Sequence, residues 1–507
     1  MTEWRTTTAD GETITRACAW SPPGCHPVGC GLKVHVKDGK LIKVEGDPEH
    51  PITRGALCPR CLSLKDYVYN PARIIYPMKR DKKDRGKDKW ERCSWEEALD
   101  IIEENAKEIT KKYGAESICV FGGTGREANN YYGMWANAVF GSPNSVYAQS
   151  GWSCYGPRCS TTAFMLGGGY PEIDYAQKFY DRYDHPGWVA PEVILIWGKE
   201  PLKSNPDGLW GHAIIDMVKD FGTKLICVDP RITWLGTRAE EVLQLRPGTD
   251  TALAMAFLNI LISEDLYDHD FVDRWTYGFD QLAERVTEMP PEKAAEICDV
   301  PVDQIYRAAR LYGNASPSSV CWGLAVDQNP NGVQLGQCLI ALMSITGYLD
   351  APGGTTLGRA FSTPGYHKTD SEVGTAQASQ TETEETKKNK STQMNSAFDI
   401  AVDNGIMPRE LWDKRIGADI HPAVTSVIWT VDPDDFLETL ESGDPYQIHM
   451  AMFSSSNPVG AAISAEPQRW CEALKKLDFN FATDLFMNPT IMSCCDVFLP
   501  LSSTIEH

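Results

Sequence analysis

The stretch that decides the fold is Cys18–Cys61, which reads CAWSPPGCHPVGC, then a spacer of twenty-seven residues, then CPRC. It holds three thiols within its first thirteen residues and a fourth directly after the spacer, namely those of Cys18, Cys25, Cys30 and Cys58. Four thiolates that meet in space suit Zn²⁺ or an iron–sulfur cluster. Zinc sites usually pair their cysteines as two CxxC knuckles, and only Cys58 and Cys61 have that spacing here. The three-plus-one pattern therefore favours a cubane cluster.

The spacer itself predicts a small β-hairpin. Val34 and Val36 alternate with polar residues, Asp38-Gly39 is a typical two-residue turn, and a second apolar run follows it. Because a hairpin returns the chain to its starting point, we expect Cys58 to lie close to the earlier thiols.

The composition argues against several classes of function. The chain has 507 residues, too many for one core, so we expect two to four domains. A net charge of −21 argues against nucleic acid and against an anionic membrane surface, because both attract Lys and Arg. No run of about eighteen apolar residues occurs, so we expect no membrane span. Most other cysteines stand singly in apolar runs, so we expect their thiols to be reduced. The first residues lack an apolar export signal, so we expect a cytoplasmic protein.

After the cysteine stretch, apolar strands alternate with amphipathic helices, which predicts an α/β fold class. We expect a small N-terminal iron–sulfur domain of β-hairpins, followed by two doubly wound, Rossmann-like α/β domains. The clearest unit has apolar strands at 193–197 and 224–228, the first ending at Gly198 and the second at Asp229. An acidic residue after the second strand is where a doubly wound sheet contacts a nucleotide. We therefore expect a nucleotide-binding crevice here, next to the helix that begins after Arg246–Asp250.

The same pattern returns near the end of the sequence. The pattern consists of a strand, the string Ser-Asn-Pro, a second strand and then an Asp. It occurs once between 193 and 229 and again between 448 and 484. Two similar crevices predict a ligand with two nucleotide tails or two copies of one ligand. Residues 367–396, rich in Thr, Ser, Glu, Gln and Lys, are expected to form a mobile insertion.

These motifs resemble the molybdenum or tungsten bis-pterin oxidoreductases, the superfamily of dimethyl sulfoxide reductase and formate dehydrogenase. The resemblance rests on the cysteine stretch and on the ordered strings GDPEHP, RGALCPR, VDPR, LRPGTD, TGYLDAPGG and DVFLP. It implies a [4Fe–4S] cluster and a bis-molybdopterin guanine dinucleotide that carries Mo or W. It also implies that Cys18, Cys25, Cys30 and Cys58 hold the cluster, with Cys61 as the alternative to Cys58. Arg60 is then expected to lie between the cluster and the pterin.

By the same resemblance, the ligand of Mo or W is Cys154 in SGWSCYGPRCS, because a soft thiolate suits a metal already bound by dithiolene sulfurs. Cys159 is the alternative ligand. Arg158 is the candidate catalytic handle for an anion or a proton, and a structural arginine is the other interpretation.

The resemblance also assigns one dinucleotide to each crevice. The residues expected around the first are Asn205, Asp229, Arg231, Gly248 and Asp250, and those around the second are Ser455, Asn457, Asp484 and Asn488. Gln328 and Asn331 are expected to contact pterin. Backbone amides are expected to approach phosphates at Gly198, Gly323 and the Ser454–Ser456 turn.

The expected domains are a [4Fe–4S] domain at 1–70, a discontinuous pterin-binding α/β domain at 71–148 with 346–507, and an α/β domain with the metal ligand at 149–345. Members of the superfamily have a further β-barrel after the DVFLP string. The sequence stops at His507, so we expect the barrel to be lacking here or to come from a separate chain.

The expected reaction is a two-electron transfer of an oxygen atom, a hydroxyl or a hydride on a small organic substrate, such as a reductive dehydroxylation. The cluster relays the electrons to an iron–sulfur or other electron-transfer protein. There are two alternatives. One is a non-redox hydratase or lyase on the same cofactor, and the other is a catalytically inactive iron–sulfur electron-transfer subunit.

Overall fold

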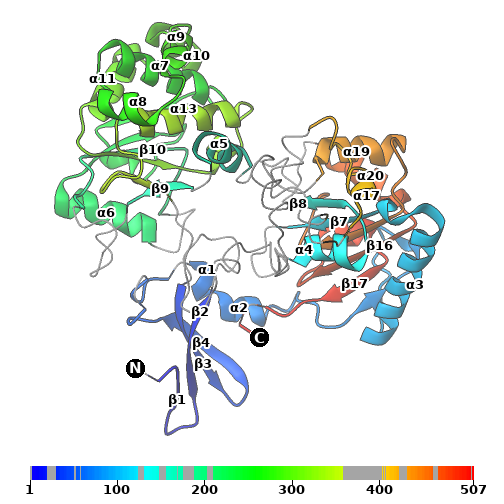
Figure 1. Ribbon diagram of the computed structural model, residues 1–507. Coiled ribbons are helices and arrows are strands. Elements are labelled where there is room, and N and C mark those ends of the chain that lie inside the picture. Colours follow the sequence, from blue (N-terminus) through cyan, green and yellow to red (C-terminus); the bar gives the residue numbers. More distant parts are fainter. Residues whose placement is uncertain are drawn as a thin grey trace, which may run out of the picture. The chain divides into compact units, whose positions relative to one another are not determined.

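The structure is a computed structural model (Figure 1). It describes residues 3–19, 30–50, 53–57, 59–123, 131–147, 156–167, 170–174, 188–202, 209–357, 402, 405, 407–421, 431–460, 466–503 and 505–506. The predicted insertion at 367–396 lies outside these residues, and so do Cys25, Cys58, Cys154 and Asn205.

The N-terminal cysteine stretch forms a four-stranded sheet of order β1-β2-β3-β4. Its elements are β1 (Arg5–Thr7), β2 (Thr13–Ala19), β3 (Cys30–Lys37) and β4 (Lys40–Gly46), followed by α1 (Pro59–Leu62). The predicted hairpin is confirmed: β3 and β4 are antiparallel, with Val34 opposite Val44. Asp38 and Gly39 have φ of 52° and 72°, the left-handed backbone that a type I′ turn requires.

The first α/β sheet is parallel, with strand order β12-β11-β10-β13. Its strands are β10 (Val193–Trp197), β11 (Lys224–Val228), β12 (Glu241–Leu243) and β13 (Ser318–Trp322). The helices of this region are α5 (Gly156–Leu166), α6 (Leu209–Phe221), α7 (Asp250–Ser263), α8 (His269–Trp275), α9 (Phe279–Val286), α10 (Pro291–Cys298), α11 (Val302–Gly313), α12 (Leu324–Asp327) and α13 (Gly332–Ile345). A small antiparallel pair joins β9 (Pro171–Ile173) to β14 (Thr355–Leu357).

Both faces of this sheet are covered (Figure 1). Leu195 and Trp197 pack into a core shared with α7, α11 and α13, whereas Ile194 and Ile196 pack against α6. Every residue of β10 is buried as a result, which explains why the strand reads as an unbroken apolar run.

The second α/β sheet has seven strands in the order β6-β5-β17-β16-β15-β7-β8. They are β5 (Met78–Lys79), β6 (Glu91–Arg92), β7 (Ile118–Gly122), β8 (Asn144–Tyr147), β15 (Met450–Ser454), β16 (Phe479–Asp484) and β17 (Val497–Pro500). The helices are α2 (Leu64–Val68), α3 (Trp95–Tyr113), α4 (Tyr131–Met134), α17 (Arg409–Trp412), α19 (Pro433–Ser442), α20 (Pro467–Lys476) and α21 (Pro489–Cys494). Strands from two distant parts of the sequence thus form one sheet.

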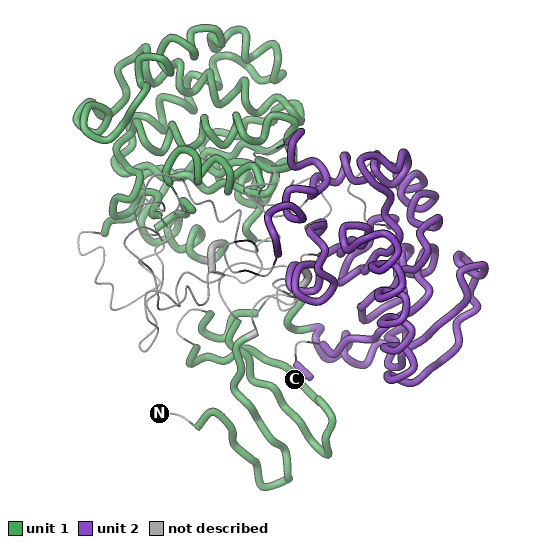
Figure 2. The backbone as a smooth tube through the Cα atoms, turned by 45° about the vertical axis from the view of Figure 1, so that its right-hand side comes forward, with its two compact units in different colours: residues 1–18, 25–62, 153–359 green, residues 19–24, 63–152, 360–507 purple. Residues whose placement is uncertain are grey.

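The chain divides into two compact units (Figure 2). Unit 1 comprises residues 1–18, 25–62 and 153–359, and unit 2 comprises 19–24, 63–152 and 360–507. The domain bounds expected from the sequence stay a prediction. No helix in the described part of the chain has the length and apolarity that a bilayer crossing needs.

Candidate cofactor sites

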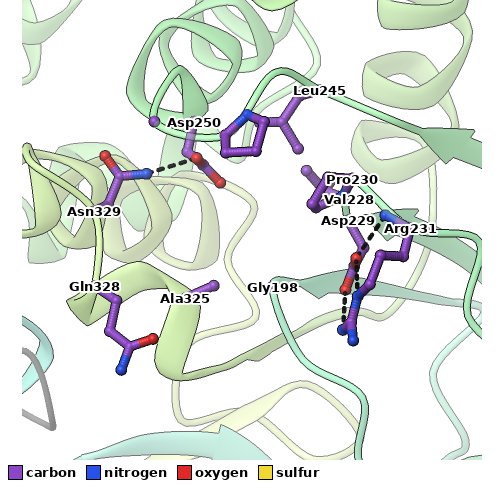
Figure 3. A pocket seen from close by; sticks show the side chains of 12 residues that line it. Gly198, Val228, Asp229, Pro230, Arg231, Leu245, Asp250, Ala325, Gln328 and Asn329 are labelled. Atoms are coloured by element: carbon purple, nitrogen blue, oxygen red, sulfur yellow. Dashed lines mark hydrogen bonds and ion pairs between the residues drawn. The ribbon is translucent and has the colours of Figure 1, made fainter. Parts of the chain in front are cut away.

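A cavity of about 250 Å³ opens at the carboxyl ends of β10 and β11 (Figure 3). Ligands of doubly wound proteins bind at this edge of the sheet. The residues lining it are Gly198, Val228, Asp229, Pro230, Arg231, Leu245, Pro247, Gly248, Asp250, Ala325, Gln328 and Asn329. Six residues that the sequence singled out meet here: Gly198, Asp229, Arg231, Gly248, Asp250 and Gln328. Asn331 is not among them; its backbone carbonyl accepts a hydrogen bond from Thr251 Oγ1 at 3.5 Å.

Two carboxylates lie on opposite sides of this cavity (Figure 3). Asp229 Oδ1 accepts hydrogen bonds from the Arg231 backbone N–H at 2.8 Å and from Arg231 Nε at 3.2 Å. Asp250 accepts from Trp197 Nε1 at 3.0 Å and from Asn329 Nδ2 at 2.6 Å. Burial raises the pKa of Asp250. The cavity therefore offers acceptors for the N–H groups of a base and, in the exposed Arg231 guanidinium, a cation for an anionic group.

The glycine turns after β10 and β13 pack backbone against backbone. Gly198 has φ of 58°, and a Cβ there would lie 2.6 Å from Ala325 Cβ. A Cβ on Gly323 would collide with the Gly198 carbonyl oxygen. The amides of both glycines are already used, since Gly198 N–H donates to Val228 O at 2.9 Å and Gly323 N–H to Trp197 O at 3.0 Å. The strand ladder thus continues one residue further at both glycines, and the expected approach of their amides to phosphates stays a prediction.

The Gly323→Ala substitution is expected to displace the turn after β10, whose Gly198 lines this cavity. The new methyl group has no space beside Gly198, so the β10 turn must shift, at a cost of about 1–3 kcal/mol in unfolding free energy. Denaturant unfolding measures that cost. Gly133→Ala is the matched control, because a Cβ there meets nothing within 4 Å. Equal stability of both variants would contradict the close packing.

The second sheet repeats the strand register of the first. In the first, Trp197 lies opposite Val228 on one side and Trp322 on the other. In the second, Ser454 lies opposite Thr483 and Gly122 in the same way. These pairs make β15, β16 and β7 the counterparts of β10, β11 and β13.

The residues after these strands correspond as well. Ser455 has φ of 50°, close to the value of Gly198, and its N–H donates to Thr483 O at 3.0 Å. A Cβ on Gly123 would collide with the Ser455 carbonyl oxygen, as one on Gly323 would with Gly198. Asp484 takes the place of Asp229 at the end of the neighbouring strand. Burial raises the pKa of Asp484.

Two amide side chains organise the loops at these strand ends of the second sheet. Asn457 Oδ1 accepts three hydrogen bonds, from Thr490 N, Thr490 Oγ1 and Gly460 N at 2.9–3.2 Å. Asn488 Oδ1 caps α21 at Ile491 N, and its Nδ2 donates to Asp484 Oδ2 at 2.9 Å. Both side chains therefore hold the loops around Asp484 in place.

Two of the four candidate cluster thiols lie within the described residues. Cys18 is at the end of β2 and Cys30 begins the neighbouring strand β3. Burial and the nearby Cys30 sulfur raise the pKa of Cys18. His50 Nδ1 accepts from the Thr53 N–H at 3.1 Å, so the proton of the neutral ring is on Nε2, which faces Cys18 Sγ at 3.9 Å.

The loop after β4 returns the chain to the start of β3. Gly31 N–H donates to Thr53 Oγ1 at 3.1 Å, and Asp47 N–H donates to Gly31 O at 2.9 Å. Cys61, the alternative ligand, is fully buried in α1, and Arg60 beside it is half-buried. The loop before position 58 and the helix α1 after it thus lie where a cluster held by Cys18 and Cys30 would need them.

Arg158 is held by a buried carboxylate. Its Nε donates to Asp327 Oδ2 at 2.7 Å, its Nη2 lies 2.6 Å from the same oxygen, and its backbone N–H donates to Asp327 Oδ1 at 3.0 Å. The guanidinium also lies 5.8 Å from the centre of the Trp322 ring. This geometry favours the interpretation of Arg158 as a structural arginine that fixes the first turn of α5. Cys159, the alternative metal ligand, is exposed on the same helix.

Three residues of these sites were missed in the sequence. Asn329 and Trp197 hold Asp250, and Asp327 holds Arg158. The string Gln328-Asn329-Pro330-Asn331 contains three amides, but nothing in it distinguishes Asn329 from its neighbours.

Comparison with known proteins agrees with this arrangement. The family model described as "Molybdopterin oxidoreductase" matches residues 73–507, and the one described as "Molybdopterin oxidoreductase Fe4S4 domain" matches residues 23–70. The chain belongs to the molybdopterin oxidoreductase family. Its cofactors are therefore a [4Fe–4S] cluster and a molybdopterin. The Fe4S4 match includes Cys25, Cys30, Cys58 and Cys61 and begins after Cys18.

Relatives within the family carry different activities. Acetylene hydratase of Syntrophotalea acetylenica is 31% identical over 326 residues, which are 63% of this chain and 42% of that protein. Dimethyl sulfoxide reductase DmsA of Haemophilus influenzae is 30% identical over 373 residues, 66% of this chain and 44% of that protein. The solved structure of acetylene hydratase from Pelobacter acetylenicus matches 94% of this chain and 62% of its own, with TM-score 0.71 and 27% identity. The chain spans less than half the length of these two curated relatives.

Proposed function

We propose that this chain is the cluster- and pterin-binding part of a molybdenum or tungsten oxidoreductase. It transfers an oxygen atom, a hydroxyl or a hydride to or from a small organic substrate and exchanges electrons with a separate electron-transfer protein. The observation that supports this most is the pair of register-matched strand ends, which carry a buried carboxylate in the first sheet, Asp229, and a half-buried one in the second, Asp484. A cofactor with two nucleotide tails needs two such sites.

The residues present fit that cofactor. Asp229 and Asp250 beside the first sheet and Asp484 at the end of β16 accept the N–H groups of a guanine base. Cys30 and its neighbouring thiols hold the cluster. Cys154 or Cys159 is the protein ligand of the metal, and the Arg158–Asp327 pair fixes the helix that begins just after Cys154. When bound, the metal–pterin group supplies a two-electron redox centre.

Metal analysis of protein purified without oxygen tests this function. We expect about four Fe and one Mo or W per chain, and net oxidation of a reduced artificial electron donor during turnover. Four Fe without Mo or W would overturn it and would favour an electron-transfer subunit.

A hydratase is the second candidate, supported by the likeness to acetylene hydratase. It predicts that the same metals are present but that substrate is hydrated with no net oxidation of an electron donor. The donor assay therefore separates the two functions.

The Asp484→Asn substitution is expected to weaken one dinucleotide site only. The amide loses the charge and one acceptor position, so bound GMP released by acid hydrolysis should fall from two toward one per chain. Asp229→Asn is expected to have the same effect at the other crevice. Asp220→Asn, an exposed residue of α6, is the control. Two GMP per chain in both variants would contradict the assignment.

A further inference from the structure

Two cysteines at the contact between α20 and α21 belong to neither cofactor site. Cys471 is half-buried within α20, and Cys494 is the buried last residue of α21. The Cys494 thiol donates to the Cys471 carbonyl oxygen across 3.8 Å. The two thiols therefore adjoin each other on packed helices, and one of them is accessible.

Three groups favour the thiolate form of Cys471. They are the Cys494 thiol, the Ser493 hydroxyl and the ammonium of Lys475, which lies one helical turn further along α20. The hydrogen bond from Cys494 and the other two donors lower the pKa of Cys471 to about 6, whereas that hydrogen bond and burial raise the pKa of Cys494. A thiolate beside a protonated thiol has the chemistry of a nucleophilic cysteine with its resolving partner.

The helix α21 connects this pair to Asp484 at the end of β16. It is preceded by Asn488, the residue that bonds to Asp484, and it ends at Cys494. With six residues it is about 9 Å long. A covalent bond at Cys494 would therefore fix one end of the helix whose other end holds the Asp484 side chain.

We propose that Cys471 is a site of oxidative modification and that it forms a reversible disulfide with Cys494, which fixes α21 against α20. Hydrogen peroxide is the oxidant. The Cys471 thiolate takes one oxygen to become a sulfenic acid, and the other oxygen leaves as hydroxide, which gains a proton to form water. The Cys494 sulfur then attacks the Cys471 sulfur, and its proton leaves with the sulfenic hydroxyl as a second water.

The first test is alkylation of the full chain with iodoacetamide, followed peptide by peptide by mass spectrometry. The Cys471 rate is expected to rise less than about two-fold between pH 6.5 and pH 8.5, whereas a thiol of ordinary pKa gains about 50-fold. Cys494→Ala and Lys475→Met should each restore a steeper rise, and Lys476→Met, the matched control, should not. A 50-fold gain for the unaltered protein would overturn the proposal.

The second test is oxidation with one equivalent of hydrogen peroxide. We expect one cross-linked peptide pair, containing Cys471 and Cys494, that is absent after reduction with dithiothreitol. The Cys471→Ser variant should yield no such pair. Accumulation of sulfinic acid at Cys471 without the cross-link would overturn the disulfide.

Discussion

Serine in place of Cys30 is expected to abolish the iron–sulfur cluster. Cys30 is 1% exposed, begins β3 and lies next to Cys18, so its sulfur has a fixed position at the thiol end of the sheet. A serine oxygen is a harder and shorter ligand that suits iron of the cluster poorly. Iron content should fall from about four per chain to below one, with loss of the cluster's electron paramagnetic resonance signal after reduction.

A set of single variants makes this test specific. Cys93→Ser, which changes a buried cysteine in unit 2, should keep all its iron. Cys18→Ser and Cys61→Ser then identify the remaining ligand, because the Fe4S4 family match covers Cys61 and not Cys18. Four iron atoms retained in the Cys30→Ser protein would contradict the assignment of the cluster to this sheet.

Removal of the Asp327 carboxylate is expected to be among the most destabilising single changes in unit 1. The Asp327→Ala substitution leaves the Arg158 guanidinium, whose side chain is 6% exposed, without the carboxylate that holds it. Breaking a buried pair from one side costs about 3–5 kcal/mol. Denaturant unfolding should show that loss, and metal content should fall with it because α5 follows the candidate ligand Cys154.

The double variant Arg158→Met with Asp327→Asn separates charge from packing. It removes both charges, keeps similar volumes and leaves the Asn oxygen as acceptor for the Arg158 backbone N–H, so much of the lost stability should return. A single Asp327→Ala variant that loses less than about 1 kcal/mol would contradict the role of the pair.

Local patterns predicted the parts of the fold that depend on neighbours in sequence. The Asp38-Gly39 turn defined the first hairpin, and the apolar run at 193–197 with Asp229 defined the edge of the cavity. These features follow from turn geometry and from burial on both faces of a sheet, which are legible in short windows.

The sequence was less informative about which polar groups are already paired. Asn457 was expected to contact a cofactor, but its Oδ1 accepts three hydrogen bonds from its own loop and from α21. Arg158 was a candidate catalytic residue, and its partner Asp327 is far away in the sequence. Such pairings are set by tertiary packing, so a residue type alone does not reveal whether a ligand or the protein uses it.

The discontinuous second sheet has a consequence for biosynthesis. Strand β7 pairs through Cys119 and Val120 with Ala451 and Met452 of β15, which are synthesised much later. At roughly 5–20 residues per second, β7 waits on the order of tens of seconds for that partner on the ribosome. The strands of the first α/β sheet, β10 to β13, emerge together in the meantime. Sheet formation in unit 1 can therefore precede that in unit 2. Until β15 is made, β7 can pair only with β8, so its other edge is open to aggregation.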